Sequence, residues 1–100
     1  MNIEKVIEEL QKVNPEWDGF YRYDDDNRTW LGLSDTNISD ITPLNGMPLR
    51  MLNLNYTNVS DLTPLKGMPL ELLWLDNTPA AKKPLPKWLD GVNVYGLKGK

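Results

Sequence analysis

Cysteine and histidine are both absent from this chain of 100 residues. Without cysteine there is no disulfide framework and no thiol chemistry. Without histidine the chain lacks the commonest general base and the commonest metal ligand. The sequence also shows no Gly-rich phosphate loop and no nucleophile paired with a base. We therefore expect a non-enzyme that uses no cofactor and no metal, with a carboxylate-only enzyme as the remaining catalytic alternative.

Long apolar runs and a surplus of positive charge are also missing. Nothing approaches the roughly 18 consecutive apolar residues of a membrane span, and the N-terminal segment is too charged for a secretory signal. The net charge is −3, with acidic and basic residues interspersed, unlike the basic footprint of a nucleic-acid binder. Lysines 82, 83, 87, 98 and 100 are expected to be a solvated face and tail. These features predict a protein that binds neither nucleic acid nor membrane. We expect it to be cytoplasmic, unless it was excised from a longer exported protein.

A repeat of 21 residues dominates the rest of the sequence. Residues 31–51 and 52–72 are identical at 13 of 21 positions, and a third copy begins at Leu73 and breaks at Pro79. A period between 20 and 30 with a leucine rhythm is typical of solenoids, in which each repeat stacks on the next. Repeats of this kind usually serve as binding surfaces, which also argues against catalysis.

The first half of each copy predicts a short strand with a buried face. Leucines alternate with variable residues, and a period of two places both leucines of a pair toward the core. A threonine follows, whose hydroxyl can bond the backbone where the chain leaves the strand. The leucine pairs are Leu31 and Leu33, Leu52 and Leu54, and Leu73 and Leu75, and the threonines are Thr36, Thr57 and Thr78.

The second half of each copy predicts a tight turn. An aspartate caps it, a Pro-Leu pair forms one helical turn, and a glycine with positive φ ends it. These residues are Asp40, Pro43, Leu44 and Gly46 in the first copy, and Asp61, Pro64, Leu65 and Gly67 in the second. Capping explains the recurrence of Asp40 and Asp61 better than acid–base catalysis does.

The pattern L-x-L-x-x-T-x-(I/V)-S-D-(I/L)-T-P-L, at 31–44 and again at 52–65, resembles the leucine-rich repeat family. The phrase Thr-Pro-Leu-x-Gly-Met-Pro-Leu is similar to short bacterial repeats, with threonine where many family members carry an asparagine ladder. The resemblance implies an α/β solenoid with a short parallel sheet. We expect a single domain, with residues 1–30 as N-terminal cap, 31–78 as repeats and 79–100 as C-terminal cap.

The N-terminal cap is expected to be a helix followed by a hairpin. Apolar side chains at helical spacing predict a helix over 3–13, with Asn2 as N-cap and Asn14-Pro15 as its end. A loop at 15–19 leads to strands at 20–23 and 28–33, joined by a turn at 24–27. The three aspartates and the asparagine of that turn could suggest calcium, but they lack the glycine and glutamate of an EF-hand loop, so a solvated turn is expected.

The C-terminal cap is expected to close the other end of the core. Residues 86–91 predict one helical turn, with Trp88 and Leu89 covering the core. Residues 92–94 predict a last strand, 19 residues after the leucine pair of the third copy.

The sheet face opposite the leucines is the candidate binding surface. Its residues differ between copies while the leucines do not, so the fold does not dictate them, and exposed apolar patches often mark interfaces. The alternative is that Trp30 and Trp74 tuck against the caps and the surface is inert. The candidate partner-binding residues are Trp30, Met51, Asn53, Asn55, Tyr56, Leu72, Trp74 and Asp76.

These observations predict non-catalytic protein recognition through the concave face of the sheet. The alternative is a structural or assembly element that self-associates or caps a larger protein. We expect a monomer or a weak homodimer that binds an unidentified protein partner.

Overall fold

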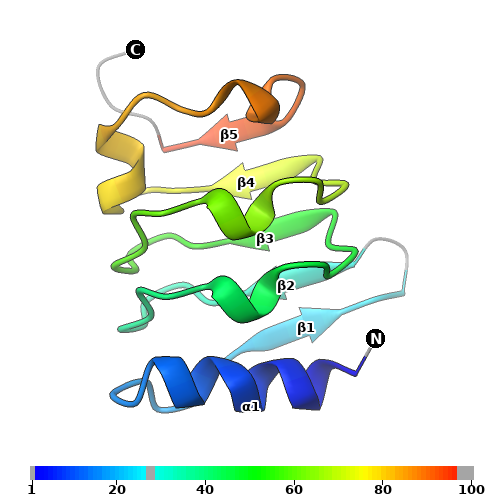
Figure 1. Cartoon of the computed structure of the whole chain (residues 1–100), viewed down its shortest axis with the longest axis vertical. Helices are drawn as coiled ribbons and strands as arrows, with labels where there is room; N and C mark the ends of the chain where they lie inside the picture. Colours follow the sequence, from blue (N-terminus) through cyan, green and yellow to red (C-terminus); the bar gives the residue numbers. More distant parts are fainter. Residues whose placement is uncertain (1, 27–28, 97–100) are drawn as a thin grey trace.

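The computed structural model describes residues 2–26 and 29–96, which form one α-helix and a five-stranded mixed sheet. The strands lie in the order of the chain, and helix α1 (Ile3–Val13) and short 3-10 turns lie along one face of the sheet (Figure 1). The strands are β1 (Arg22–Asp24), β2 (Trp30–Gly32), β3 (Met51–Asn53), β4 (Leu72–Trp74) and β5 (Asn93–Tyr95).

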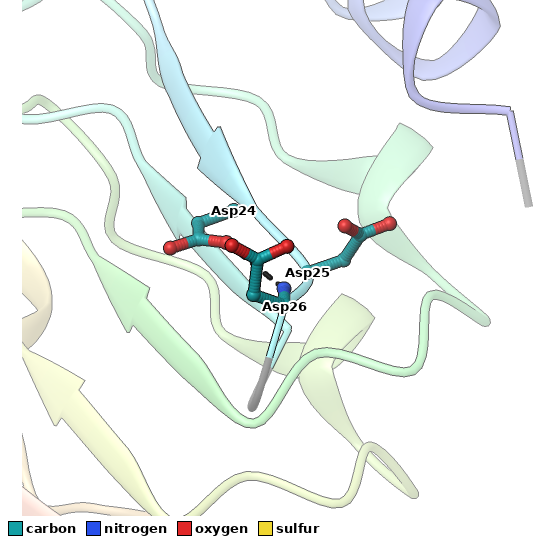
Figure 2. Close-up of side chains that lie close together, drawn as sticks. All are labelled: Asp24, Asp25 and Asp26. Carbon is teal, nitrogen blue, oxygen red and sulfur yellow. Dashed lines mark hydrogen bonds between the residues drawn. The ribbon is translucent and has the colours of Figure 1, made fainter.

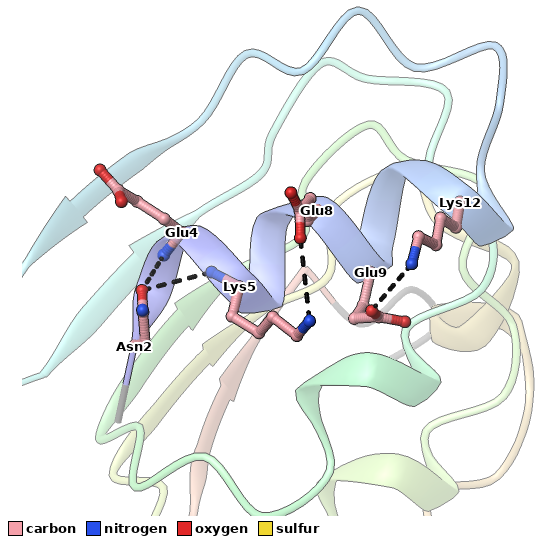
Figure 3. Close-up of polar contacts among 6 residues, drawn as sticks. All are labelled: Asn2, Glu4, Lys5, Glu8, Glu9 and Lys12. Atoms are coloured by element: carbon pink, nitrogen blue, oxygen red, sulfur yellow. Dashed lines mark hydrogen bonds and ion pairs between the residues drawn. The ribbon is translucent and has the colours of Figure 1, made fainter.

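Helix α1 has the bounds that the sequence predicts. The Asn2 side-chain oxygen accepts hydrogen bonds from the backbone N–H groups of Glu4 and Lys5, at 2.9 and 3.3 Å (Figure 3). This contact satisfies donors that the first helical turn would otherwise leave free. Val6, Ile7 and Leu10 are buried. The Lys5–Glu8 and Glu9–Lys12 ion pairs on the opposite side are solvent-exposed and contribute little.

Strands β2, β3, β4 and β5 are parallel and keep one spacing. Leu31 pairs with Leu52, Leu52 with Leu73, and Leu73 with Val94, always 21 residues on. The predicted spacing of 19 for the last strand is therefore wrong. Only Val94 takes a core-facing position in β5, while Val92 lies before the strand and packs at the edge of the core.

The predicted hairpin is confirmed, because β1 pairs with β2 antiparallel and places Arg22 opposite Gly32. Its first strand begins two residues later than predicted, because β2 offers partners to only three residues. Phe20 and Tyr21 precede the strand. Asn27, the last residue of the predicted turn, and Arg28 lie outside the described residues, as do Lys98 and Lys100.

The core follows the repeat pattern. All six leucines of the three pairs are buried, with exposures of 0 or 1%. The Thr36, Thr57 and Thr78 hydroxyls each donate a 2.8 Å hydrogen bond to a strand-end carbonyl, as predicted. The tight turns form as 3-10 helices η1 (Thr42–Leu44) and η2 (Thr63–Leu65), and φ is +87° at Gly46 and +83° at Gly67.

Both ends of this core are covered. Helix α1 packs on η1, and the Trp17 side chain is buried although the sequence predicted only a loop there. At the other end, η3 (Pro79–Lys82) replaces the regular turn, and η4 (Lys87–Leu89) buries Leu89 and half-buries Trp88. Within the described ranges, no helix is long and apolar enough to cross a lipid bilayer.

Candidate binding face

The side chains that alternate with the buried leucines form the sheet face away from α1, here called the open face. No helix of the described residues lies over it (Figure 1). Strand register arranges its residues in rows that cross the sheet. The first row is Asp24, Trp30, Met51, Leu72 and Asn93, and the second is Arg22, Gly32, Asn53, Trp74 and Tyr95. Ser34, Asn55 and Asp76 follow at the same spacing at the carboxyl ends of β2, β3 and β4.

One aromatic group lies where β1 meets β2. A Cβ atom on Gly32 would lie 3.0 Å from two ring carbons of Trp30, so the indole lies against the Gly32 backbone. The Phe20 ring is 57% exposed, and the Arg22 guanidinium lies 5.9 Å from its centroid. These residues line a hollow of about 440 Å³, together with Ser34, Asp35 and Asn53.

A second aromatic group lies at the other end of the sheet. The rings of Trp74 and Tyr95 are stacked, with centroids 5.9 Å apart and planes 24° apart. Trp74 is half-buried and Tyr95 is 49% exposed, so the stack presents ring surface to solvent. Asn53 pairs with Trp74 on the neighbouring strand, as expected from the repeat.

Asn53 and Asn55, two of the candidate binding residues, are half-buried instead of fully exposed. The Asn53 side-chain oxygen accepts a hydrogen bond from the Asn55 backbone N–H at 2.9 Å. The Asn55 oxygen in turn accepts from the Asp76 N–H on the next strand at 2.7 Å. Both side chains therefore hold strand ends in place, which draws them toward the backbone.

Tyr56 has a backbone conformation that the sequence did not reveal. Its φ is +58°, and Asp35 and Asn77, at the equivalent positions of the neighbouring copies, have φ of +59° and +56°. Asp and Asn enter this left-handed region readily, whereas a bulky side chain there is an outlier. The Tyr56 side chain is 53% exposed.

The structure brings the eight predicted residues to one surface. Trp30, Met51 and Leu72 share the first row, Asn53 and Trp74 the second, Asn55 and Asp76 the strand ends, and Tyr56 lies just beyond them. Sequence reasoning missed Phe20, Arg22 and Asp35, which line the hollow. Phe20 and Arg22 alternate with Tyr21 and Tyr23, a pattern that places the first two on one face of a strand. The pattern does not show on which side of the sheet that face lies, because this depends on how β1 pairs with β2.

Asp24, at the end of β1, lies close to Asp25 and Asp26, which follow it in the turn (Figure 2). All three are exposed, and the Asp26 N–H donates to the Asp24 carboxylate at 2.9 Å, a contact typical of a turn. Burial, with a smaller effect of the nearby Asp25 charge, raises the pKa of the neighbouring Tyr23.

The recurring aspartates cap the tight turns, as predicted. The Asp40 carboxylate accepts from the Thr42 hydroxyl at 2.6 Å and from its N–H at 2.9 Å, and the Asp61 carboxylate accepts from the Thr63 N–H. The bonds from Thr42 lower the pKa of Asp40, and those from Thr63 lower the pKa of Asp61. Both carboxylates therefore stay ionised at neutral pH, which suits a cap and not a proton donor.

No protein-family model, curated protein or solved structure matches this chain. The chemistry of the open face is therefore the basis for assigning a function.

Proposed function

We propose that this chain is a short leucine-rich-repeat solenoid that binds a protein partner on its open face and catalyses no reaction. One observation carries the proposal. At equivalent positions the two full copies keep the leucines, threonines, prolines and glycines of the core and turns, while the residues on the open face change and include large apolar side chains. The fold needs the residues of the core and turns, so the residues of the open face are free to serve recognition.

Tyr56 supports the same function independently. The left-handed conformation costs a non-glycine residue roughly 1–2 kcal/mol, and Asp35 and Asn77 show which residues suit this position. Within the described residues the Tyr56 side chain makes no hydrogen bond, and 53% of it is exposed, so we expect asparagine to serve the fold at least as well. Strained residues cluster at functional sites, and an exposed tyrosine is a common anchor in protein interfaces.

The sharpest test is Tyr56→Asn, because the proposal expects stability and binding to change in opposite directions. Asparagine relieves the backbone cost, so the free energy of unfolding should rise by about 1 kcal/mol. Removal of the ring should weaken partner binding at the same time. Urea unfolding measures the first effect, and affinity capture from a lysate of the source cells, compared with wild type, measures the second.

Trp74→Ser tests the stack of Trp74 on Tyr95, and Val13→Ser is the matched control. Val13 is an apolar residue that is 43% exposed on α1, away from the open face. Wild type and Val13→Ser should capture the same protein, and Tyr56→Asn and Trp74→Ser should lose it. Equal capture by all four would assign binding to another surface, and the proposal would fail.

The alternative function is assembly, in which a second copy of the chain covers the apolar residues of the open face. The half-exposed side chains of Trp30, Met51 and Leu72 would suit this function as well. It predicts a defined oligomer of the pure protein, which Trp74→Ser should dissociate. Sedimentation equilibrium distinguishes the two functions, because recognition of a different protein leaves the pure chain monomeric.

A further inference from the structure

The open face and its margin carry an uneven set of charges. In the two rows of the open face and at the carboxyl ends of its strands, the described carboxylates are those of Asp24, Asp35 and Asp76, and the described cation is Arg22. The Asp35 and Asp76 carboxylates form no ion pair or hydrogen bond with another described side chain. The charge that these described side chains offer to a partner is therefore negative.

The free carboxylates gather at the carboxyl ends of the strands. Asp35 and Asp76 lie at the ends of β2 and β4, and Tyr56 follows β3 between them. Beside Asp35, a second hollow of about 120 Å³ is lined by Glu16, Asp18 and Asp35. This edge thus combines acidic groups with an exposed ring.

The aromatic rings of the open face also favour a positively charged partner. The face of an aromatic ring carries partial negative charge and attracts cations, and the chain shows this contact within itself where Arg22 lies over Phe20. Lysine and arginine can lay their methylene chains on apolar surface while the charged end reaches a carboxylate. Trp30, Met51 and Leu72 supply such a surface within the same face.

We propose that the partner presents a basic segment, in which lysine or arginine side chains reach the carboxylates of Asp35 and Asp76 while apolar side chains cover the first row. This inference rests on the proposed function and names the chemistry of the partner. Complementary charge also steers the encounter of two proteins and makes their association sensitive to salt.

The test uses two blocked pentapeptides as probes, one alternating lysine with leucine and the other alternating glutamate with leucine. Binding to the full chain is followed by the fluorescence of its own tryptophans, since neither peptide contains one. The lysine peptide should bind saturably, and about a tenfold rise in salt should weaken its binding several-fold. The glutamate peptide should not bind.

The variant Asp35→Asn with Asp76→Asn locates the effect. Asparagine tolerates the left-handed conformation of residue 35, so folding should persist, and a thermal melt checks this. Affinity for the lysine peptide should fall about tenfold. The control is Glu8→Gln with Asp90→Asn. It also removes two negative charges, but from α1 and from the end of η4, and it should bind the lysine peptide as tightly as wild type.

Three results would overturn the inference: no saturable binding of the lysine peptide, equal binding of the glutamate peptide, or equal losses in the two double variants. Each leaves the proposed function standing if Tyr56→Asn and Trp74→Ser still lose the captured protein. The opposite result is also possible: the variants capture as much protein as wild type, while the lysine peptide still binds at Asp35 and Asp76. That result would contradict the proposed function and leave the peptide site standing.

Discussion

Asn14 joins the N-terminal cap to the first repeat through its side-chain amide. The amide nitrogen donates to the carbonyls of Leu10 and Asp40, at 2.9 and 2.8 Å. The amide oxygen accepts from the N–H groups of Ser39 and Asp40, at 2.9 and 3.0 Å. All of the hydrogen-bonding capacity of this buried amide is used. The sequence marked Asn14 only as the end of a helix, because its partners in the first repeat, Ser39 and Asp40, lie 25 and 26 residues away.

Asn14→Ala should therefore destabilise the chain by about 2–4 kcal/mol, because the part-buried N–H groups of Ser39 and Asp40 lose their acceptor, and an unsatisfied buried donor costs roughly 1–3 kcal/mol. Asn37→Ala is the control, since that side chain is exposed, and it should change stability by less than about 0.5 kcal/mol. Urea unfolding of both variants measures the difference. Equal effects would show that the Asn14 network contributes little.

Gly96 is fixed by close contact as well as by conformation. Its φ is +94°, and a Cβ atom would lie 2.6 Å from the Asp76 carboxylate oxygen and 2.7 Å from the Asp76 Cα. Gly91 has nearly the same φ, +90°, with nothing within 4 Å. The two glycines therefore separate the cost of the backbone conformation from the cost of the clash.

Gly91→Ala should cost roughly 1–2 kcal/mol, the cost of a left-handed alanine. Gly96→Ala should cost about 1–3 kcal/mol more, the usual range for overpacking, because strand β5 must move away from Asp76. Thermal unfolding of the two variants gives the comparison. Identical melting temperatures would mean that β5 shifts freely.

The tight turns η1 and η2 respond to pH through their caps. A carboxyl whose pKa is lower in the folded chain than in the unfolded chain stabilises the fold above its unfolded pKa. That contribution is lost as the pH falls through the lowered value. Asp40 and Asp61 both have lowered pKa values, for which the hydrogen bonds from Thr42 and Thr63 are the largest cause.

Asp40→Asn with Asp61→Asn should flatten the acid limb of the stability curve. The wild type should lose stability between about pH 5 and pH 2, and the double variant should lose less over that window while being less stable at pH 7. Urea unfolding across the window measures both curves. Parallel curves would show that other carboxyls set the acid response.

Elements with local signals were predicted well from the sequence. Helix α1 has a cap, a periodic face and a proline after its end, and the turns η1 and η2 each have an aspartate, a proline and a glycine. Strands β1 and β5 were placed with less success, because their bounds depend on which residues of β2 and β4 face them. Trp17 was missed for a related reason, since a single aromatic residue in a loop shows no periodicity.

The candidate site was predictable to a similar extent. Alternation placed Trp30, Met51, Leu72 and Trp74 on one face, because the buried leucines determine the opposite side. It did not reveal that Asn55 holds the Asp76 backbone, or that Tyr56 has positive φ. Both properties arise from how one repeat meets the next, and a single repeat does not contain that information.

At the scale of the whole molecule, the N-terminal cap covers one end of a core that local repeats alone cannot close. Deleting residues 1–19 removes the buried Val6, Ile7, Leu10 and Trp17 and exposes the apolar residues beneath. We expect aggregation or loss of cooperative unfolding. Gel filtration measures the first, and thermal circular dichroism measures the second. A monomeric truncated chain that melts sharply would show that α1 is dispensable.

The identity of the two copies has a consequence for folding kinetics. Residues 31–51 and 52–72 share 13 of 21 positions, and the leucine pair recurs in the third copy as Leu73 and Leu75. Strand β4 therefore carries the leucines that would make the same contacts with β2 as β3 does. Weakly specified pairing of this kind invites alternative registers and exchange between chains. The groups that distinguish the copies are the Asn14 network, the Gly96 contact and the side chains of the open face. We therefore expect the order of the strands to depend on the ends of the molecule and its variable surface more than on the leucines.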